Sequence, residues 1–292
     1  MLAVLVLGAV PAQADEDLAV SVSIPPIHSL VAGVMVGVAE PGLLAEAGAS
    51  PHGFALRPSQ MAAIGVAALI VRVGEALDGF LDRAIAARSD DMRVLTLTAL
   101  PEITLRRWAA ADSANHGHDD SPFDPHIWLD PANARVIVAA VADELARLDP
   151  SNDALYNANA TALDAQLATL DDELRTLLAP LAERPFVAFH DAYGYFQEAY
   201  GLKGAIAVTR DPERKPGARR ISELRETIET LGIACVFAEP QYPDALVETL
   251  IEGTGARLAR LDPLGVGIAP GPEAYFLLMR AMAGAIAACA AD

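Results

Sequence analysis

The sequence predicts an α/β protein with two lobes, each with a mainly parallel sheet of about four strands flanked by helices, joined by a long rigid helix. Three observations predict this fold. Strand-like and helix-like segments alternate in both halves of the 292-residue chain. A long helical pattern separates the two halves. Apolar residues make up 53% of the chain, which is enough to form a buried core and too much for a disordered protein.

The first half supplies four strand-like segments with helical patterns between them. Pro25 ends the first strand, and Gly74 follows the third. Ser59 is the expected N-cap of the second helix. Because strands that alternate with helices pair in parallel, these segments predict βαβ units. The expected strands are 18–23, 42–47, 68–73 and 93–97, and the expected helices are 28–36, 60–67 and 77–87.

Helical patterns occupy the middle of the chain. They follow a polar, acidic segment, residues 112–125, which carries His116 and His118 and is typical of a loop. One helix is expected over residues 131–148 and a second over 152–181. Leucines recur on one face of the second helix at steps of three and four residues, at Leu163, Leu167, Leu170, Leu174, Leu177 and Leu181.

This leucine-striped helix has two interpretations. It is either a core helix or coiled-coil arm, or a stiff spine that joins two lobes. We predict the spine, which divides the chain into an N-terminal lobe over residues 15–150, a linking helix over 151–182 and a C-terminal lobe over 183–292. In the last lobe the expected strands are 186–189, 204–208, 233–238 and 256–261, and the expected helices are 192–199, 217–231, 244–252 and 272–290.

The first residues are typical of an export signal. Residues 1–10 form an apolar run that is too short to span a bilayer, and Ala12-Gln13-Ala14 is a small-x-small cleavage pattern. The alternative is a buried N-terminal strand or helix. We expect residues 1–14 to be a signal peptide, or its remnant, and the mature protein to lie in the periplasm.

The two cysteines, Cys235 and Cys289, agree with an exported protein. An even pair in an oxidising compartment indicates a disulfide, which here would join a strand to the last helix. Two separately buried thiols are the alternative.

The charge balance excludes some classes of partner. The chain has 21 Lys and Arg against 39 Asp and Glu, a formal net charge of −18. This balance argues against binding to nucleic acid or to an anionic membrane, and it suits a protein that handles cations.

Three of the six histidines follow predicted strands or lie in loops where this fold class places ligands. These are His52, His126 and His190, and Asp262 follows another strand. Imidazole and carboxylate are ligand types that Zn²⁺ accepts. Taken singly, each histidine is more typical of a loop or capping residue than of a ligand. His28, after the first strand, is expected to be structural.

The chain resembles the periplasmic zinc-binding proteins of ABC importers, the ZnuA-type members of the cluster A-I solute-binding family. The similar segments run along the whole mature chain, and together they are specific. They are Gly48-Ala49-Ser50-Pro51-His52, Leu56-Arg57-Pro58-Ser59, residues 124–131 (Asp-Pro-His-Ile-Trp-Leu-Asp-Pro), residues 189–196 (Phe-His-Asp-Ala-Tyr-Gly-Tyr-Phe), Pro216-Gly217-Ala218-Arg219, Phe237-Ala238-Glu239-Pro240-Gln241 and Leu261-Asp262-Pro263-Leu264-Gly265.

The resemblance implies that the three histidines bind the metal and that Asp262 or water is the fourth ligand. Pro51 stands where some zinc-binding members have a glutamate. Residues 112–125 look like a shortened form of the family's His-rich loop, and the Cys235–Cys289 pair matches a disulfide of zinc-binding members. Three imidazoles favour Zn²⁺ over Mn²⁺, whereas Cu²⁺ would also bind such a site in vitro.

The resemblance implies capture of Zn²⁺ by a monomer and its delivery to an ABC permease, with a periplasmic metallochaperone as a further candidate partner. A stiff spine predicts small lobe tilts on binding.

The alternative functions are those of a zinc hydrolase and of a Mn²⁺-binding or adhesin-like member of the same fold. For a hydrolase, Glu239 and Asp191 are the candidate bases, although both could instead support the ligand imidazoles. No His-Glu-x-x-His, Gly-x-Ser-x-Gly or Walker-type motif is present.

Overall fold

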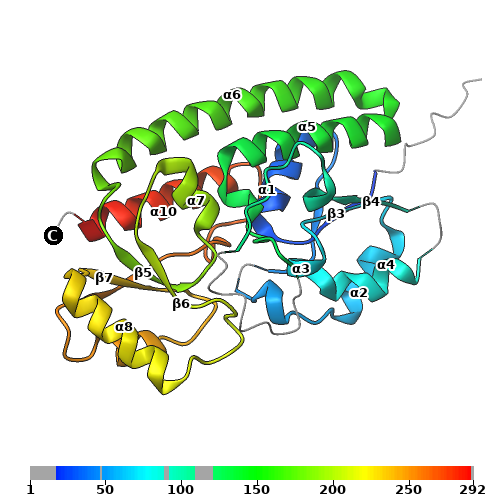
Figure 1. Ribbon diagram of the computed structural model, residues 1–292. Helices are drawn as coiled ribbons and strands as arrows, with labels where there is room; N and C mark the ends of the chain where they lie inside the picture. Colours follow the sequence, from blue (N-terminus) through cyan, green and yellow to red (C-terminus); the bar gives the residue numbers. More distant parts are fainter. Residues whose placement is uncertain (1–17, 47, 89–91, 109–120, 291–292) are drawn as a thin grey trace, which may run out of the picture.

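A computed structural model describes residues 18–46, 48–88, 92–108 and 121–290. It confirms the predicted α/β architecture of two sheets, with four parallel strands in each (Figure 1). In spatial order the first sheet contains β2 (Gly42–Leu43), β1 (Val20–Val22), β3 (Leu69–Arg72) and β4 (Arg93–Thr96). The second contains β6 (Ala205–Thr209), β5 (Phe186–His190), β7 (Cys235–Ala238) and β8 (Arg257–Arg260).

Helices cover both sheets and span the two lobes. Figure 1 shows α5 and α6 running side by side, with α6 extending over both lobes and α8 on the opposite side of the second sheet. The helices are α1 (Pro25–Val34), α2 (Pro58–Val66), α3 (Glu75–Asp78), α4 (Asp82–Ala86), α5 (Pro131–Leu148), α6 (Asp153–Leu178), α7 (Gly194–Tyr200), α8 (Ala218–Leu231), α9 (Ala245–Ile251) and α10 (Ala274–Ala290).

Several boundaries differ from the sequence prediction. Arg57, not Ser59, is the N-cap of α2, because Pro58 occupies the first helical position, where a missing N–H costs nothing. The expected helix over 77–87 is two short helices, α3 and α4, separated by a 3₁₀ turn that begins at Gly79. Strand β2 contains two residues rather than six.

The leucine stripe of α6 is buried as predicted, except at its end. Leu163, Leu167, Leu170 and Leu174 lie in the core. The next buried leucine is Leu178, whereas Leu177 is 41% exposed. The four-residue step from Leu174 therefore continues the buried face.

One large core connects the two lobes. It contains the α6 stripe, the inner faces of α1, α5 and α10, and apolar residues of both sheets. Two smaller cores lie beneath α8 and α9 in the second lobe and around α2 and α4 in the first. Helix α10 also packs on α1, where the Ser29 hydroxyl donates to the Pro272 carbonyl at 3.0 Å and accepts the Tyr275 N–H at 2.8 Å. Because the lobes share a close-packed core, large relative rotations would be costly.

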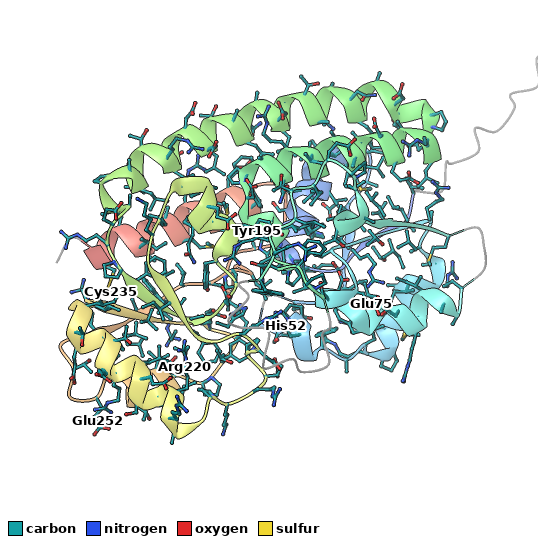
Figure 2. The ribbon with its side chains drawn as sticks, in the orientation of Figure 1. His52, Glu75, Tyr195, Arg220, Cys235 and Glu252 are labelled. Carbon is teal, nitrogen blue, oxygen red and sulfur yellow. A yellow bond between two sulfur atoms is a disulfide. The ribbon has the colours of Figure 1, made fainter. Side chains whose placement is uncertain are left out.

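A disulfide joins Cys235 of β7 to Cys289 of α10, as predicted. Figure 2 shows Cys235 near one end of the molecule and His52 near its middle. The predicted signal peptide, residues 1–14, lies outside the described residues, and so do His116 and His118. No helix in the described part of the chain is long and apolar enough to cross a membrane.

Candidate metal centre

The carboxyl ends of the strands and the loops that follow them bring the predicted residues together between the lobes. His190 is the last residue of β5, and Glu239 directly follows β7. His52 lies in a 3₁₀ turn, Pro51–Gly53, and His126 precedes a second 3₁₀ turn, Ile127–Leu129. This is the place where parallel α/β sheets bind ligands.

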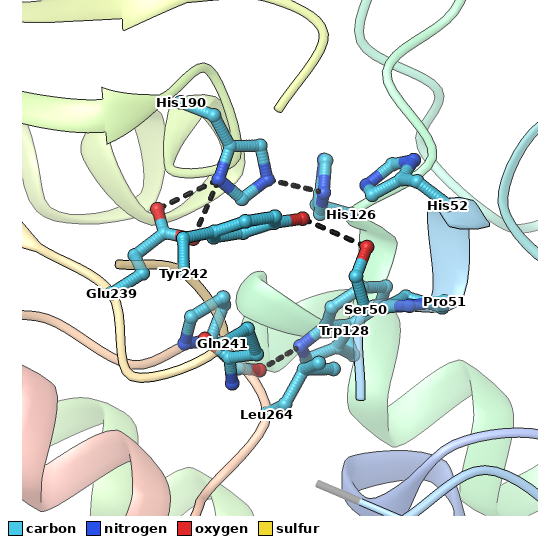
Figure 3. A pocket seen from close by; sticks show the side chains of 11 residues that line it. Ser50, Pro51, His52, His126, Trp128, His190, Glu239, Gln241, Tyr242 and Leu264 are labelled. Atoms are coloured by element: carbon cyan, nitrogen blue, oxygen red, sulfur yellow. Dashed lines mark hydrogen bonds and ion pairs between the residues drawn. The ribbon is translucent and has the colours of Figure 1, made fainter. Parts of the chain in front are cut away.

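The three predicted histidines converge on one point. One ring nitrogen from each lies within 4.8 Å of the others, and the Nε2 atoms of His126 and His190 are 3.3 Å apart (Figure 3). Zinc–nitrogen bonds of about 2.0–2.1 Å at the tetrahedral angle place two ligand nitrogens about 3.3–3.4 Å apart. The spacing of these two nitrogens therefore fits a single tetrahedral ion.

Two carboxylates orient two of the rings. Asp124 Oδ1 lies 2.7 Å from His126 Nδ1, and both carboxylate oxygens of Glu239 lie 2.7 Å from His190 Nδ1. The Tyr193 hydroxyl donates to Glu239 at 3.0 Å. A carboxylate partner favours the tautomer with the proton on Nδ1, which leaves the Nε2 lone pair free to face the shared point. Glu239 thus supports a ring, one of the two roles considered for it.

Asp124, which supports the His126 ring, is not among the site residues that the sequence predicts, although it stands in the acidic loop and in the 124–131 motif. Its side chain also accepts the backbone N–H of His126 at 3.0 Å, which is the geometry of an Asx turn. The Asp124-Pro125-His126 spacing is the signal that could have indicated it. Arg106 donates to the other Asp124 oxygen at 3.2 Å and to Glu198 of α7 at 2.8 Å.

The electrostatic environment differs among the rings. Burial lowers the pKa of His52 and of His126 well below the usual value, and repulsion from the neighbouring histidines adds to this. Burial also lowers the pKa of His190, but the Glu239 carboxylate outweighs it, so the net pKa is raised. Burial raises the pKa of Asp124 to about 7, against the stabilising His126 N–H and Arg106. Two rings are therefore neutral at pH 7, and His190 is the ring most prone to hold a proton.

The structure does not bring Asp262 into the histidine group. Its Oδ1 accepts the N–H groups of Leu264 and Gly265 at 2.9 and 3.0 Å, and its Oδ2 accepts that of Val266 at 2.5 Å. Gln241 Nε2 also donates to Oδ1 at 2.8 Å. Asp262, one of the two expected fourth ligands beside water, thus caps the turn that follows β8 in this structure.

The remaining candidates lie beside the centre or away from it. Asp191 follows His190, donates its backbone N–H to the Thr209 carbonyl at 3.1 Å, and its charge helps to raise the pKa of His190. His28 is buried in α1 with Nε2 2.9 Å from the Pro41 carbonyl, which agrees with a structural role.

The space between the rings is small and closely lined. Its volume is about 10 Å³, which is room for about one ion or water molecule. The walls include Trp128, whose indole N–H donates to the Pro263 carbonyl at 2.9 Å. A site of this size can take a small ion.

Comparisons with known proteins place the chain in a family. A family model described as "Zinc-uptake complex component A periplasmic", ZnuA, matches residues 20–289. The chain belongs to this family. A ZnuA of Paracoccus denitrificans, named a high-affinity zinc uptake system protein, is 38% identical over 97% of this chain and 94% of its own length.

Two solved structures show the same fold. A crystal structure of ZnuA has a TM-score of 0.82 and 27% identity, and it covers 94% of this chain and 99% of that one. A ZnuA deletion mutant with zinc bound has a TM-score of 0.80 and 27% identity over 93% of this chain and 97% of that one. The family resemblance that the sequence motifs predicted is thus confirmed.

Proposed function

We propose that this protein captures Zn²⁺ in the periplasm through His52, His126 and His190 and delivers it to the permease of an ABC importer. The observation that carries the proposal is the convergence of three imidazole nitrogens within 4.8 Å of one another. The zinc-bound and zinc-uptake relatives support the same cargo.

Water is the proposed fourth ligand. The Asp262 carboxylate accepts the N–H groups of Leu264, Gly265 and Val266 and does not lie in the histidine group, so it would have to move to bind the ion. Three nitrogen ligands and one water suit Zn²⁺ better than Mn²⁺, which prefers oxygen ligands.

Transport fits the site better than hydrolysis does. A zinc hydrolase needs a general base beside the metal-bound water. Glu239 lines the pocket, but its carboxylate oxygens are engaged by the His190 ring and the Tyr193 hydroxyl. The space between the rings, about 10 Å³, also suits a single ion.

The shared core of the two lobes supports small lobe tilts rather than wide hinge closure. The proposed partners are Zn²⁺, the permease and, as a further candidate, a periplasmic metallochaperone, and we propose that the protein acts as a monomer. A pair of crystal structures, without and with zinc, tests the motion: a lobe rotation of tens of degrees would contradict it.

The direct test is zinc binding by competition with a chelator of known affinity. We expect one tight site per chain, and no hydrolysis of ester or phosphoester substrates by the zinc-loaded protein. Zinc should also raise the melting temperature, because it binds the folded state alone. A stoichiometry of zero, or tight binding that survives the loss of His126, would contradict the proposal.

A further inference from the structure

One side chain that lines the metal pocket, that of Tyr242, reaches from the C-terminal lobe to the N-terminal lobe. It lies in the loop between β7 and α9, and its hydroxyl donates to the Ser50 hydroxyl oxygen of the first lobe at 2.8 Å. Its ring stacks on Phe189 with ring centroids 4.7 Å apart. Figure 3 shows the hydroxyl pointing past the histidines to Ser50. The stacking on Phe189 therefore holds the Tyr242 ring in place, and the Tyr242 hydroxyl makes the contact with the first lobe.

The contact reaches the His52 turn, which is the least supported part of the site. Ser50 is separated from His52 only by Pro51. Within the described residues, no Asp or Glu carboxylate forms an ion pair with the His52 ring, whereas His126 and His190 each have one. The position of His52 thus depends on how its turn is held.

A second side chain of the C-terminal lobe lies against the same turn. The Glu213 carboxylate is so close to Gly53 that a Cβ there would come within 3.1 Å of it. One Glu213 oxygen is also 3.3 Å from the Tyr242 hydroxyl. Tyr242 and Glu213 therefore flank the His52 turn, one on the Ser50 side and the other on the Gly53 side.

Deeper contacts fix the two lobes independently of Tyr242. Trp128 of the first lobe donates to the Pro263 carbonyl of the second at 2.9 Å, and the Tyr195 hydroxyl donates to the Asp124 carbonyl at 2.9 Å. Both bonds are buried. Loss of the Tyr242–Ser50 bond would therefore free the His52 turn without separating the lobes.

We propose that the Tyr242–Ser50 hydrogen bond is a latch that sets how fast the metal leaves the site. The inference rests on the zinc-binding function proposed above. When the bond is closed, the His52 turn is held in place for coordination. When it breaks, the turn and its ring can move away, and the ion is left on the two carboxylate-supported histidines.

Tyr242→Phe tests the latch, because it removes only the hydroxyl and keeps the ring stacked on Phe189. Zinc-loaded protein is mixed with excess chromogenic chelator, and the rate of zinc release is followed by stopped flow. We expect release to be about 3- to 10-fold faster, which is the effect of one net hydrogen bond. The association rate should change by less than about twofold, since interface contacts act mostly on dissociation.

Ser50→Ala and the double variant decide whether the hydroxyl acts through Ser50. Ser50→Ala should speed release nearly as much as Tyr242→Phe, and the double variant should add little, because both changes remove the 2.8 Å bond, which is the shorter of the two contacts of the Tyr242 hydroxyl. Tyr156→Phe is the matched control, since it removes a hydroxyl bonded to Asp149 at the start of α6, away from the pocket, and should leave release unchanged.

Unchanged release in Tyr242→Phe, or fully additive effects in the double variant, would overturn the latch while leaving zinc capture intact. Failure of the unaltered protein to bind one zinc ion would instead overturn the proposed function, and the latch with it. The melting temperatures of the metal-free variants, expected within about 2 °C of the unaltered protein, show that each variant folds.

Discussion

His126 and His190 are held differently from His52. The first two rings are buried, each has its Nδ1 on a buried carboxylate, and their Nε2 atoms are already at zinc-ligand spacing. His52 is only partly buried, lies on a 3₁₀ turn, and is positioned through its neighbours Ser50 and Gly53.

This difference indicates that the three ligands of one site have different roles. A fixed pair of ligands gives tight binding, because little ordering is needed when the ion arrives. A third ligand on a separately held turn gives a route by which the ion can leave. A protein that must both capture and deliver its cargo needs both properties.

The largest expected effect comes from removing the ligands themselves. His126→Ala and His190→Ala should each lower zinc affinity by more than about a hundredfold. Loss of a residue that only hydrogen-bonds a ligand usually costs about 10- to 100-fold, and loss of the ligand itself should cost more. His52→Ala should cost less, because water can enter from the partly exposed side. Chelator competition measures the zinc affinity of all three variants. Equal losses of affinity would contradict the proposed difference between His52 and the other two histidines.

Loss of a supporting carboxylate should have the next largest effect. Glu239→Gln and Asp124→Asn should each weaken zinc binding by about 10- to 100-fold, because the amide no longer fixes the tautomer or adds basicity to the ring. Asp262→Asn is the matched control. It should change the zinc affinity by less than about threefold while lowering the melting temperature. A loss of affinity as large as that of Glu239→Gln would show that Asp262 is a ligand after all.

Acid should weaken binding first through His190. Its pKa is raised, so as the pH falls its proton competes with zinc before protons reach His52 or His126, whose pKa values are lowered. The affinity should therefore fall about tenfold per pH unit below the pKa of His190, and more steeply once the other rings protonate.

Glu239→Gln sharpens this pH prediction. Without the carboxylate, burial lowers the pKa of His190, and the onset of the affinity loss should move to lower pH. Isothermal titrations between pH 5 and about 8 measure both profiles. An affinity that does not change over this range, or an unshifted onset in the variant, would contradict the assignment.

The smallest effect on zinc binding should come from the disulfide, far from the His52 turn. Cys235→Ser with Cys289→Ser opens a loop with a sequence separation of 54 residues, which should cost about 4 kcal/mol of unfolding free energy by loop entropy. Zinc affinity at 25 °C should change by less than about threefold. Denaturant unfolding gives the first value and chelator competition the second, and a large affinity loss would show that the site depends on the position of β7.

The sequence predicted most of the fold because the two hydrophobic periods, two for strands and 3.6 for helices, can be read locally. The strand ends indicated where ligands could lie, and the resemblance to the zinc-binding family implied the three histidines. The sequence did not predict where carboxylates point. Asp262 and Asp124 each stand in a motif close to the site, yet one caps a turn and the other holds His126. That choice depends on which N–H groups lie nearby in three dimensions.

The most direct test of the central claim is the zinc coordination shell, measured by X-ray absorption on the protein loaded with one equivalent of zinc. We expect three imidazole nitrogens at about 2.0–2.1 Å and one light oxygen from water, with one imidazole lost in His52→Ala. A shell with two or fewer imidazoles in the unaltered protein, or one that is the same in His52→Ala, would contradict the three-histidine site.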